Sequence, residues 1–249
     1  MPIRRHTPAH LLAAAVALAI IAPVRPAAAD PGIYLTWNDC SLAPEATASL
    51  AGACDNANQE QLFLSFELPA AADSVIEMDA VVDVQTGPTT LPAWWRYDPE
   101  GCRYGMLVAR AGFDGYTACA DFWRGAATFD GPPVYVASSR GPNTARIVIS
   151  FGVLASEFRA LSAGTRYYAA RLVFQNDPIG ACLGCEASAC LLFNSIHLGR
   201  LNSTPARDVY LETPGSPAAN RVTWQSTSAS CAAVPTLRHT WGQLKSLYR

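Results

Sequence analysis

Apolar side chains recur at every second position in several separate stretches of this chain, and this spacing constrains the fold more than any other feature of the sequence. A period of two places such residues on one face of a β-strand. Gly, Pro and Asn residues between the stretches indicate turns. The clearest rows lie in residues 62–68, 75–84, 147–153 and 168–174.

Six further stretches have the length and composition of strands: residues 32–37, 104–110, 133–138, 191–198, 209–212 and 221–225. Ten short strands separated by turns predict an all-β chain that folds as a single disulfide-stapled β-sandwich, Ig-like or jelly-roll-like. We expect one domain over residues 30–239, because no repeat or low-complexity linker marks a boundary within it.

Helix is expected in two short segments only. Residues 156–163 are predicted to form a connecting helix closed by Gly164. Residues 240–249 begin with Thr240 and Gln243 in a capping-box arrangement and carry apolar residues at helical spacing. This short C-terminal amphipathic helix is interpreted either as an element that packs on the domain or as a docking or sorting tag.

Residues 1–29 have the features of a cleavable signal peptide: a positive start at Arg4-Arg5, a central apolar run and small residues at 27–29. The apolar run is shorter than the roughly 20 residues of a spanning helix, so we expect cleavage rather than a retained anchor. No later apolar run reaches that length. The protein is therefore predicted to be exported, to the periplasm or the cell exterior, with no membrane span in the mature chain.

The charge balance argues against nucleic acid as a partner. Removal of Arg4, Arg5 and Arg25 with the signal leaves 15 of 18 basic residues against 20 acidic ones, so the formal net charge falls from −2 to −5. A phosphate backbone requires a basic stripe, and none occurs. We expect no nucleic-acid partner and no cofactor.

All eight cysteines lie beyond the signal: Cys40, Cys54, Cys102, Cys119, Cys182, Cys185, Cys190 and Cys231. An even number in an exported chain predicts complete pairing in disulfides. Spacing alone does not fix the connectivity. Short loops favour Cys40 with Cys54 and Cys102 with Cys119 as local pairs.

The closely spaced Cys182, Cys185 and Cys190, taken with Cys231, allow two other interpretations. One is a thiol-disulfide redox site, and the other is a four-thiolate zinc site. Neither has its usual context, because a redox pair commonly opens a helix after a strand and a zinc site commonly has a second close cysteine pair. Structural disulfides are the favoured interpretation.

Several segments near cysteines and tryptophans form a characteristic combination. They are residues 34–40 (YLTWNDC), 91–96 (LPAWWR), 182–185 (CLGC), 222–225 (VTWQ) and 240–249 (TWGQLKSLYR). The combination resembles a group of uncharacterised exported bacterial proteins with the same cysteine framework and a TWGxhKxLYR-like C-terminal ending. The likeness covers nearly all of the mature chain and implies a shared fold and export. It implies no activity and transfers no catalytic residue.

Catalytic motifs are scarce in the sequence. Only His197 and His239 lie beyond the signal, and no nucleophile elbow, zinc-protease motif or phosphate-binding glycine loop occurs. His197 is interpreted as structural. A carboxylate pair is the remaining enzymatic option, because a glycosidase needs two acids and no histidine. Glu77, Asp79 and Asp83 share one strand face, which we interpret as a solvated outer face.

Trp94, Trp95, Arg96 and Tyr97 form the candidate ligand-binding patch. In an extended loop adjacent side chains face opposite ways, so at most one of the two tryptophans would be buried. The other, with Tyr97, would offer a flat face to a sugar ring or a partner protein. The alternative is that the tryptophans pack on a neighbouring disulfide as part of the core.

Together these observations predict a secreted, non-enzymatic binding or structural module whose ligand is a carbohydrate, an envelope component or another exported protein. The first alternative is a secreted carboxylate-dependent hydrolase such as a glycosidase. The second is a redox or zinc-binding protein that uses Cys182, Cys185, Cys190 and Cys231. No catalytic residue and no metal ligand is assigned.

Overall fold

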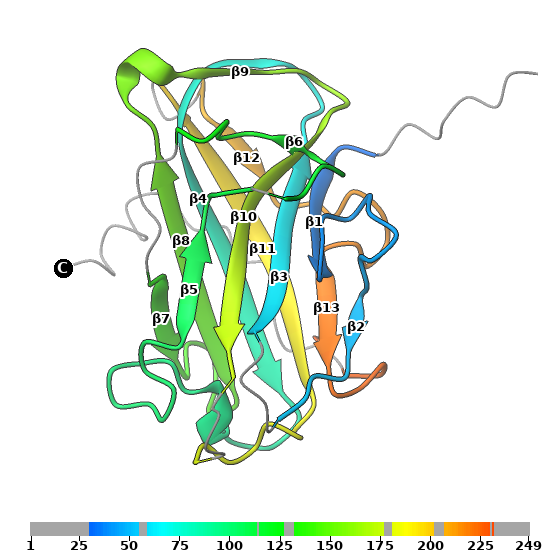
Figure 1. Cartoon of the computed structure of the whole chain (residues 1–249), viewed down its shortest axis with the longest axis vertical. Helices are drawn as coiled ribbons and strands as arrows, with labels where there is room; N and C mark the ends of the chain where they lie inside the picture. Colours follow the sequence, from blue (N-terminus) through cyan, green and yellow to red (C-terminus); the bar gives the residue numbers. More distant parts are fainter. Residues whose placement is uncertain are drawn as a thin grey trace, which may run out of the picture.

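The computed structural model describes residues 30–54, 59–113, 115–126, 132–176, 181–201, 207–229 and 231. In this part of the chain nearly all regular structure is β, and the strands form two sheets that lie one in front of the other (Figure 1). The first sheet has the order β1 (Gly32–Trp37), β3 (Gln59–Glu67), β10 (Arg166–Gln175) and β5 (Leu107–Arg110), with β6 (Ala120–Asp121) beside β10.

The second sheet is larger. Its order is β2 (Ser49–Leu50), β13 (Arg221–Trp224), β11 (Ala189–Arg200), β4 (Ala72–Thr86), β8 (Thr144–Gly152) and β7 (Val134–Ala137), with β12 (Val209–Leu211) beside β11 and β9 (Arg159–Leu161) beside β4. Neighbouring strands are antiparallel except where β6 meets β10 and β2 meets β13. The all-β fold predicted from the period of two is confirmed.

Side chains from both sheets share one apolar core. Trp37 of β1 and Trp224 of β13 come from different sheets, and their ring centroids are 5.9 Å apart. Leu64 and Phe66 of β3 belong to the same buried cluster as Val82 of β4. The alternating rows recognised in the sequence are thus the inner faces of the two sheets.

Each of the ten predicted strand segments contains a strand, whereas the short strands β2, β6 and β9 were not predicted. The helix predicted over residues 156–163 is wrong. A single 3-10 turn, η2 (Ala155–Glu157), occupies its start, and β9 follows. β9 pairs with β4 through Leu161 opposite Ala72, and Leu161 is buried in the core. Pairing at a sheet edge with a buried leucine outweighs the weak helical pattern.

The predicted signal peptide, residues 1–29, and the predicted C-terminal helix, residues 240–249, both lie outside the described residues. Among the residues that are described, no helix has the length and apolar character needed to cross a membrane.

All eight cysteines are paired, but not with the partners that short loops favoured. The disulfides join Cys40 with Cys119, Cys54 with Cys185, Cys102 with Cys182 and Cys190 with Cys231. The predicted local pairs Cys40–Cys54 and Cys102–Cys119 are therefore wrong. Sheet formation brings distant segments together, so proximity in the fold, not in the sequence, selects the partners.

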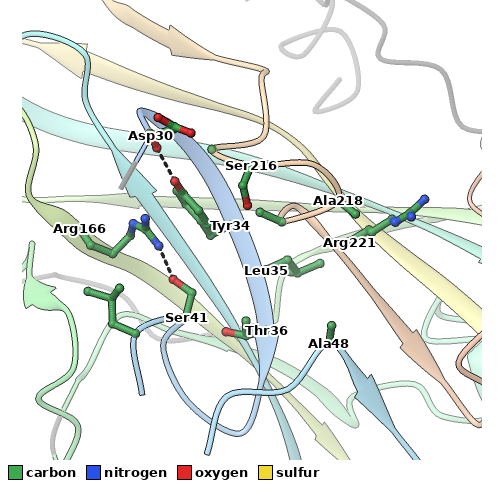
Figure 2. A pocket seen from close by; sticks show the side chains of 13 residues that line it. Asp30, Tyr34, Leu35, Thr36, Ser41, Ala48, Arg166, Ser216, Ala218 and Arg221 are labelled. Atoms are coloured by element: carbon green, nitrogen blue, oxygen red, sulfur yellow. Dashed lines mark hydrogen bonds between the residues drawn. The ribbon is translucent and has the colours of Figure 1, made fainter. Parts of the chain in front are cut away.

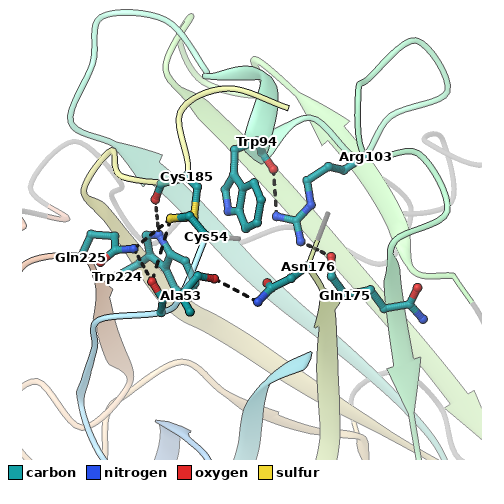
Figure 3. The surroundings of a disulfide bond; sticks show 10 residues. Ala53, Cys54, Trp94, Arg103, Gln175, Asn176, Cys185, Trp224 and Gln225 are labelled. Carbon is teal, nitrogen blue, oxygen red and sulfur yellow. Dashed lines mark hydrogen bonds between the residues drawn. A yellow bond between two sulfur atoms is a disulfide. The ribbon is translucent and has the colours of Figure 1, made fainter. Parts of the chain in front are cut away.

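The Cys54–Cys185 disulfide lies beside a cluster of tryptophans (Figure 3). The indole of Trp224 donates a hydrogen bond to the carbonyl oxygen of Cys185 at 2.7 Å. A Cβ atom added at Gly52 would lie 1.9 Å from the Trp224 ring, so only glycine leaves room for this indole. The loop that carries Cys54 is thus packed directly on Trp224.

We expect the substitution Gly52→Ala to lower the free energy of unfolding by about 1–3 kcal/mol, because the added methyl group forces Trp224 out of its position. Gly112→Ala is the matched control, since a Cβ there has no atom within 4 Å. Chemical denaturation of both variants measures the difference. Equal stability of the two variants would show that Trp224 is not confined by Gly52.

Candidate functional site

The two tryptophans of the predicted ligand-binding patch are both in the core. Trp94 and Trp95 lie in the 3-10 turn η1 (Ala93–Trp95), and only 2% and 1% of their surfaces are exposed. A 3-10 turn rotates successive side chains by about 120°, unlike an extended segment, so both indoles reach the interior. Both rings pack against Trp224, with centroids 6.4 and 6.0 Å away. The alternative interpretation, that both tryptophans pack in the core, is confirmed, and the prediction that one of them faces solvent is wrong.

A buried arginine that sequence reasoning missed supports this turn. Arg103 is fully buried, and its guanidinium carbon lies 3.6 Å from the centre of the Trp94 ring and 4.8 Å from that of Tyr97. It donates hydrogen bonds to the carbonyl oxygens of Trp94, at 3.1 Å, and Gln175 (Figure 3). Nothing in the sequence around Arg103 indicates that its side chain is buried.

Of the other two residues of the predicted patch, Tyr97 lines a pocket and Arg96 binds Asp98, another residue of its wall. Arg96 binds Asp98 through two hydrogen bonds of 2.7 and 2.6 Å, and this bond lowers the pKa of the Asp98 carboxyl. Tyr97 and Asp98 lie in the wall of a cavity of about 380 Å³. We call this cavity the tyrosine pocket; its other walls are Pro99, Tyr104, Gly105, Leu107, Pro132, Pro133 and Tyr135.

The tyrosine pocket contains one exposed tyrosine ring and two tyrosine rings that pack against each other. Tyr104 is 65% exposed. Tyr97 and Tyr135 meet edge to face with centroids 5.4 Å apart, and the Tyr135 hydroxyl donates to the carbonyl oxygen of Trp95. The volume falls in the range of about 300–1,000 Å³ that small-molecule sites occupy. Tyr97 is buried, so the prediction that its ring offers a flat face to a ligand is wrong, and sequence reasoning missed Tyr104 and Tyr135.

The hydroxyl of Tyr97 has an unusual environment. The residue is 5% exposed, and within the described part of the chain this oxygen has no hydrogen-bond partner. Burial raises the pKa of Tyr97, with Arg103 acting in the opposite sense, so the phenol stays protonated at neutral pH. A buried hydroxyl without a partner costs about 1–3 kcal/mol.

A second cavity, of about 450 Å³, lies beside β1 (Figure 2). Its buried cation, Arg166, already contacts three residues of the protein. The guanidinium carbon lies 3.2 Å from the centre of the Tyr34 ring, Nη1 donates to Ser41, and Nη2 lies 3.4 Å from the Glu67 carboxylate. These contacts make Arg166 a structural cation that holds β1 against β10.

The carboxylates Asp79 and Asp83 are not on a solvated face, and that prediction is wrong. They are 7% and 1% exposed, because each is bound by neighbours on the outer face of the second sheet. Arg146 donates to both oxygens of Asp83 at 2.7 and 2.9 Å, and Arg140 lies 3.4 Å away. Both oxygens of the Asp83 carboxylate are thus bound to arginine.

His197 lies between two carboxylates on the same face. Nδ1 is 3.3 Å from Asp79 Oδ2, and Nε2 is 3.1 Å from Asp208 Oδ2. Burial lowers the pKa of His197, but the hydrogen bonds with Asp79 and Asp208 outweigh it and raise the pKa above its usual value. The local field therefore favours positive charge at this position.

The cysteine-based alternatives do not agree with the structure. Cys182, Cys185 and Cys190 each pair with a different partner, and no cysteine is free. A redox site would join Cys182 to Cys185, and a thiolate zinc site would leave four cysteines reduced. The sulfur atoms act as cross-links between loops and strands.

We expect Trp94→Ala to lower the free energy of unfolding by about 3–5 kcal/mol, because it empties a fully packed site beside Trp224 and Arg103. Tyr104→Ala should change it by no more than about 0.5 kcal/mol, because that ring is exposed. Chemical denaturation monitored by circular dichroism measures both. A small effect of Trp94→Ala would mean that the indole is not part of the core.

Comparison with known proteins leaves the function open. No family model matches the chain, and no curated protein does. Among solved structures, the chain is similar to the crystal structure of ACE19, the collagen binding subdomain of the Enterococcus faecalis surface protein ACE, at 10% identity and a TM-score of 0.26. The match covers 79% of this chain and 97% of that one. A TM-score this low carries no argument about the fold or the ligand of this chain.

Proposed function

We propose that this chain is an exported, non-enzymatic binding module that holds a sugar ring in the tyrosine pocket. The observation that carries the proposal is the cavity of about 380 Å³ itself, whose walls contain three tyrosine rings, one of them exposed, and the Asp98 side chain. Four disulfides support an oxidising, exported location. The Ig-like or jelly-roll-like connectivity that the sequence predicts would suit such a module, which presents its loops at the ends of two sheets.

The chemistry of the walls favours a carbohydrate. Aromatic faces stack on the apolar C–H faces of a sugar ring, and the exposed Tyr104 offers such a face. The hydroxyls of the sugar need polar partners, and the Asp98 carboxylate supplies one. The pocket walls are fixed in place before binding, Asp98 by Arg96 and the Tyr97 ring by Tyr135 and Arg103. A preorganised site of this kind loses little entropy when the ligand binds.

The experiment is a glycan array with the mature, disulfide-bonded protein, followed by calorimetry with the best ligand. We expect Tyr104→Ala to weaken binding at least about tenfold, because it removes the stacking face. Asp98→Asn should weaken binding about fivefold, the equivalent of roughly 1 kcal/mol for one hydrogen bond. Tyr97→Phe should be as stable as the wild type or more stable, because it removes a buried hydroxyl without a partner.

Phe158→Ala is the matched control, since Phe158 is 50% exposed and does not line the pocket. Its affinity should equal that of the wild type. Unchanged affinity of Tyr104→Ala and Asp98→Asn would place the ligand elsewhere. Absence of any glycan ligand would contradict the proposal as a whole.

A further inference from the structure

A row of polar side chains crosses the outer face of the second sheet. Strand register places Ser150 of β8 opposite Asp79 of β4, and Asp79 opposite His197 of β11. On its other side His197 is opposite Tyr210 of β12, whose ring stacks on the imidazole with centroids 4.5 Å apart. Four strands therefore hold the imidazole and the Asp79 carboxylate in fixed positions.

Both of these groups are oriented by a further partner. Ser150 Oγ donates to Asp79 Oδ1 at 2.5 Å, which leaves Oδ2 directed at the imidazole. Asp208 Oδ2 lies 3.1 Å from His197 Nε2, so it accepts a hydrogen bond when this nitrogen carries the proton. In that tautomer Nδ1 presents its lone pair to Asp79. A carboxylate behind the far nitrogen of an imidazole is typical of histidines that bind metal ions.

Glu77 supplies a third ligand atom. It lies two residues before Asp79 on β4 and opposite Gly199 of β11. A Cβ atom at Gly199 would lie 2.2 Å from Glu77 Oε1 and 2.4 Å from its Cγ, so the absence of a side chain at residue 199 lets Glu77 lie across β11. As a result, one ligand atom each from Glu77, Asp79 and His197 lie within 4.8 Å of one another.

The distance between Asp79 and His197 is long for the hydrogen bond that joins them and is compatible with two ligands of one metal ion. Charge-assisted hydrogen bonds of this type measure about 2.7–2.9 Å, whereas Nδ1 and Oδ2 are 3.3 Å apart. Two ligands bound to one Zn²⁺ ion at about 2.0–2.2 Å and a tetrahedral angle lie about 3.3–3.6 Å apart. Imidazole with carboxylates is a ligand set suited to divalent transition metals.

We propose that Glu77, Asp79 and His197 bind one divalent transition metal ion, with Zn²⁺ as the probe, and that Asp208 and Ser150 are positioning residues. The three ligands leave a fourth coordination position for water or for an oxygen atom of a ligand. Glu77 is half-buried and Ser150 is exposed, so the site opens to solvent on that side. This site is on the outer face of the second sheet and is independent of the tyrosine pocket.

The test uses the mature, disulfide-bonded protein without a histidine tag. After dialysis against a chelator, calorimetry with Zn²⁺ should give one site per chain. His197→Gln and Asp79→Asn should each weaken binding at least about 100-fold, because each removes a ligand. Asp208→Asn should weaken it about 10–100-fold, the usual effect of losing the carboxylate behind a ligand histidine.

Two control variants should bind Zn²⁺ as the wild type does. His239→Gln removes the other histidine of the mature chain. Asp73→Asn removes a 71% exposed carboxylate from the same strand as Glu77 and Asp79. Weakened binding in either variant, with His197→Gln unaffected, would overturn the assignment.

The thermal stability of each variant is measured alongside its Zn²⁺ affinity, because His197→Gln alters a buried network. If His197→Gln does not fold, Gly199→Ala is used in its place. The added methyl group displaces Glu77, so Gly199→Ala should bind Zn²⁺ more weakly than the wild type. Absorption spectra of the Co²⁺-loaded wild-type protein should show the bands of a low-coordinate site with nitrogen and oxygen ligands. Absence of Zn²⁺ binding by the wild type, or binding of Ca²⁺ in preference to Zn²⁺, would overturn the proposal.

Discussion

The packing around Trp224 holds the two sheets and the loops at one end of the molecule together. Its ring meets Trp37 from the opposite sheet and both tryptophans of η1, while its indole nitrogen donates to the carbonyl oxygen of Cys185. The Cys54–Cys185 disulfide cross-links the loop that packs on this ring, and Gly52 leaves the space for it. Because η1 leads directly into Tyr97, the position of the tyrosine pocket depends on this aromatic cluster.

Most features that depend on residues close together in the sequence were predicted well, whereas features that depend on distant residues were not. Period-two alternation and strand-like composition are local features, and together they located ten of the strands. Disulfide partners depend on which strands meet, so a preference for short loops failed for Cys40 and Cys102. Trp94 and Trp95 were expected to point in opposite directions, but a tight turn replaces the extended loop. Neighbouring strands also supply partners that no spacing reveals, as Arg146 does for Asp83.

The two proposed sites use opposite faces of the second sheet. Asp79 alternates along β4 with Ala80 and Val82, which are in the core, so the ligands of the metal ion project outward. Tyr135 of β7 instead packs against the core and forms part of the pocket wall. Sequence reasoning recognised members of both sites, yet it assigned Asp79 to a solvated face and His197 to a structural role. Asp79 and His197 come together because of the register between their strands, and this register was not predicted from the sequence.

The crossed disulfides also determine how the chain must mature. Cys40 and Cys54 are the first two cysteines in chain order, and neither is the native partner of the other. An oxidant that acts on a chain as it emerges would join them first, and the resulting loop would keep Cys119 and Cys185 from their partners. Maturation therefore requires either that the strands assemble before oxidation or that an isomerase reshuffles early pairs. Yield in a host without disulfide isomerase activity should be limited by this step, not by the stability of the folded sheets.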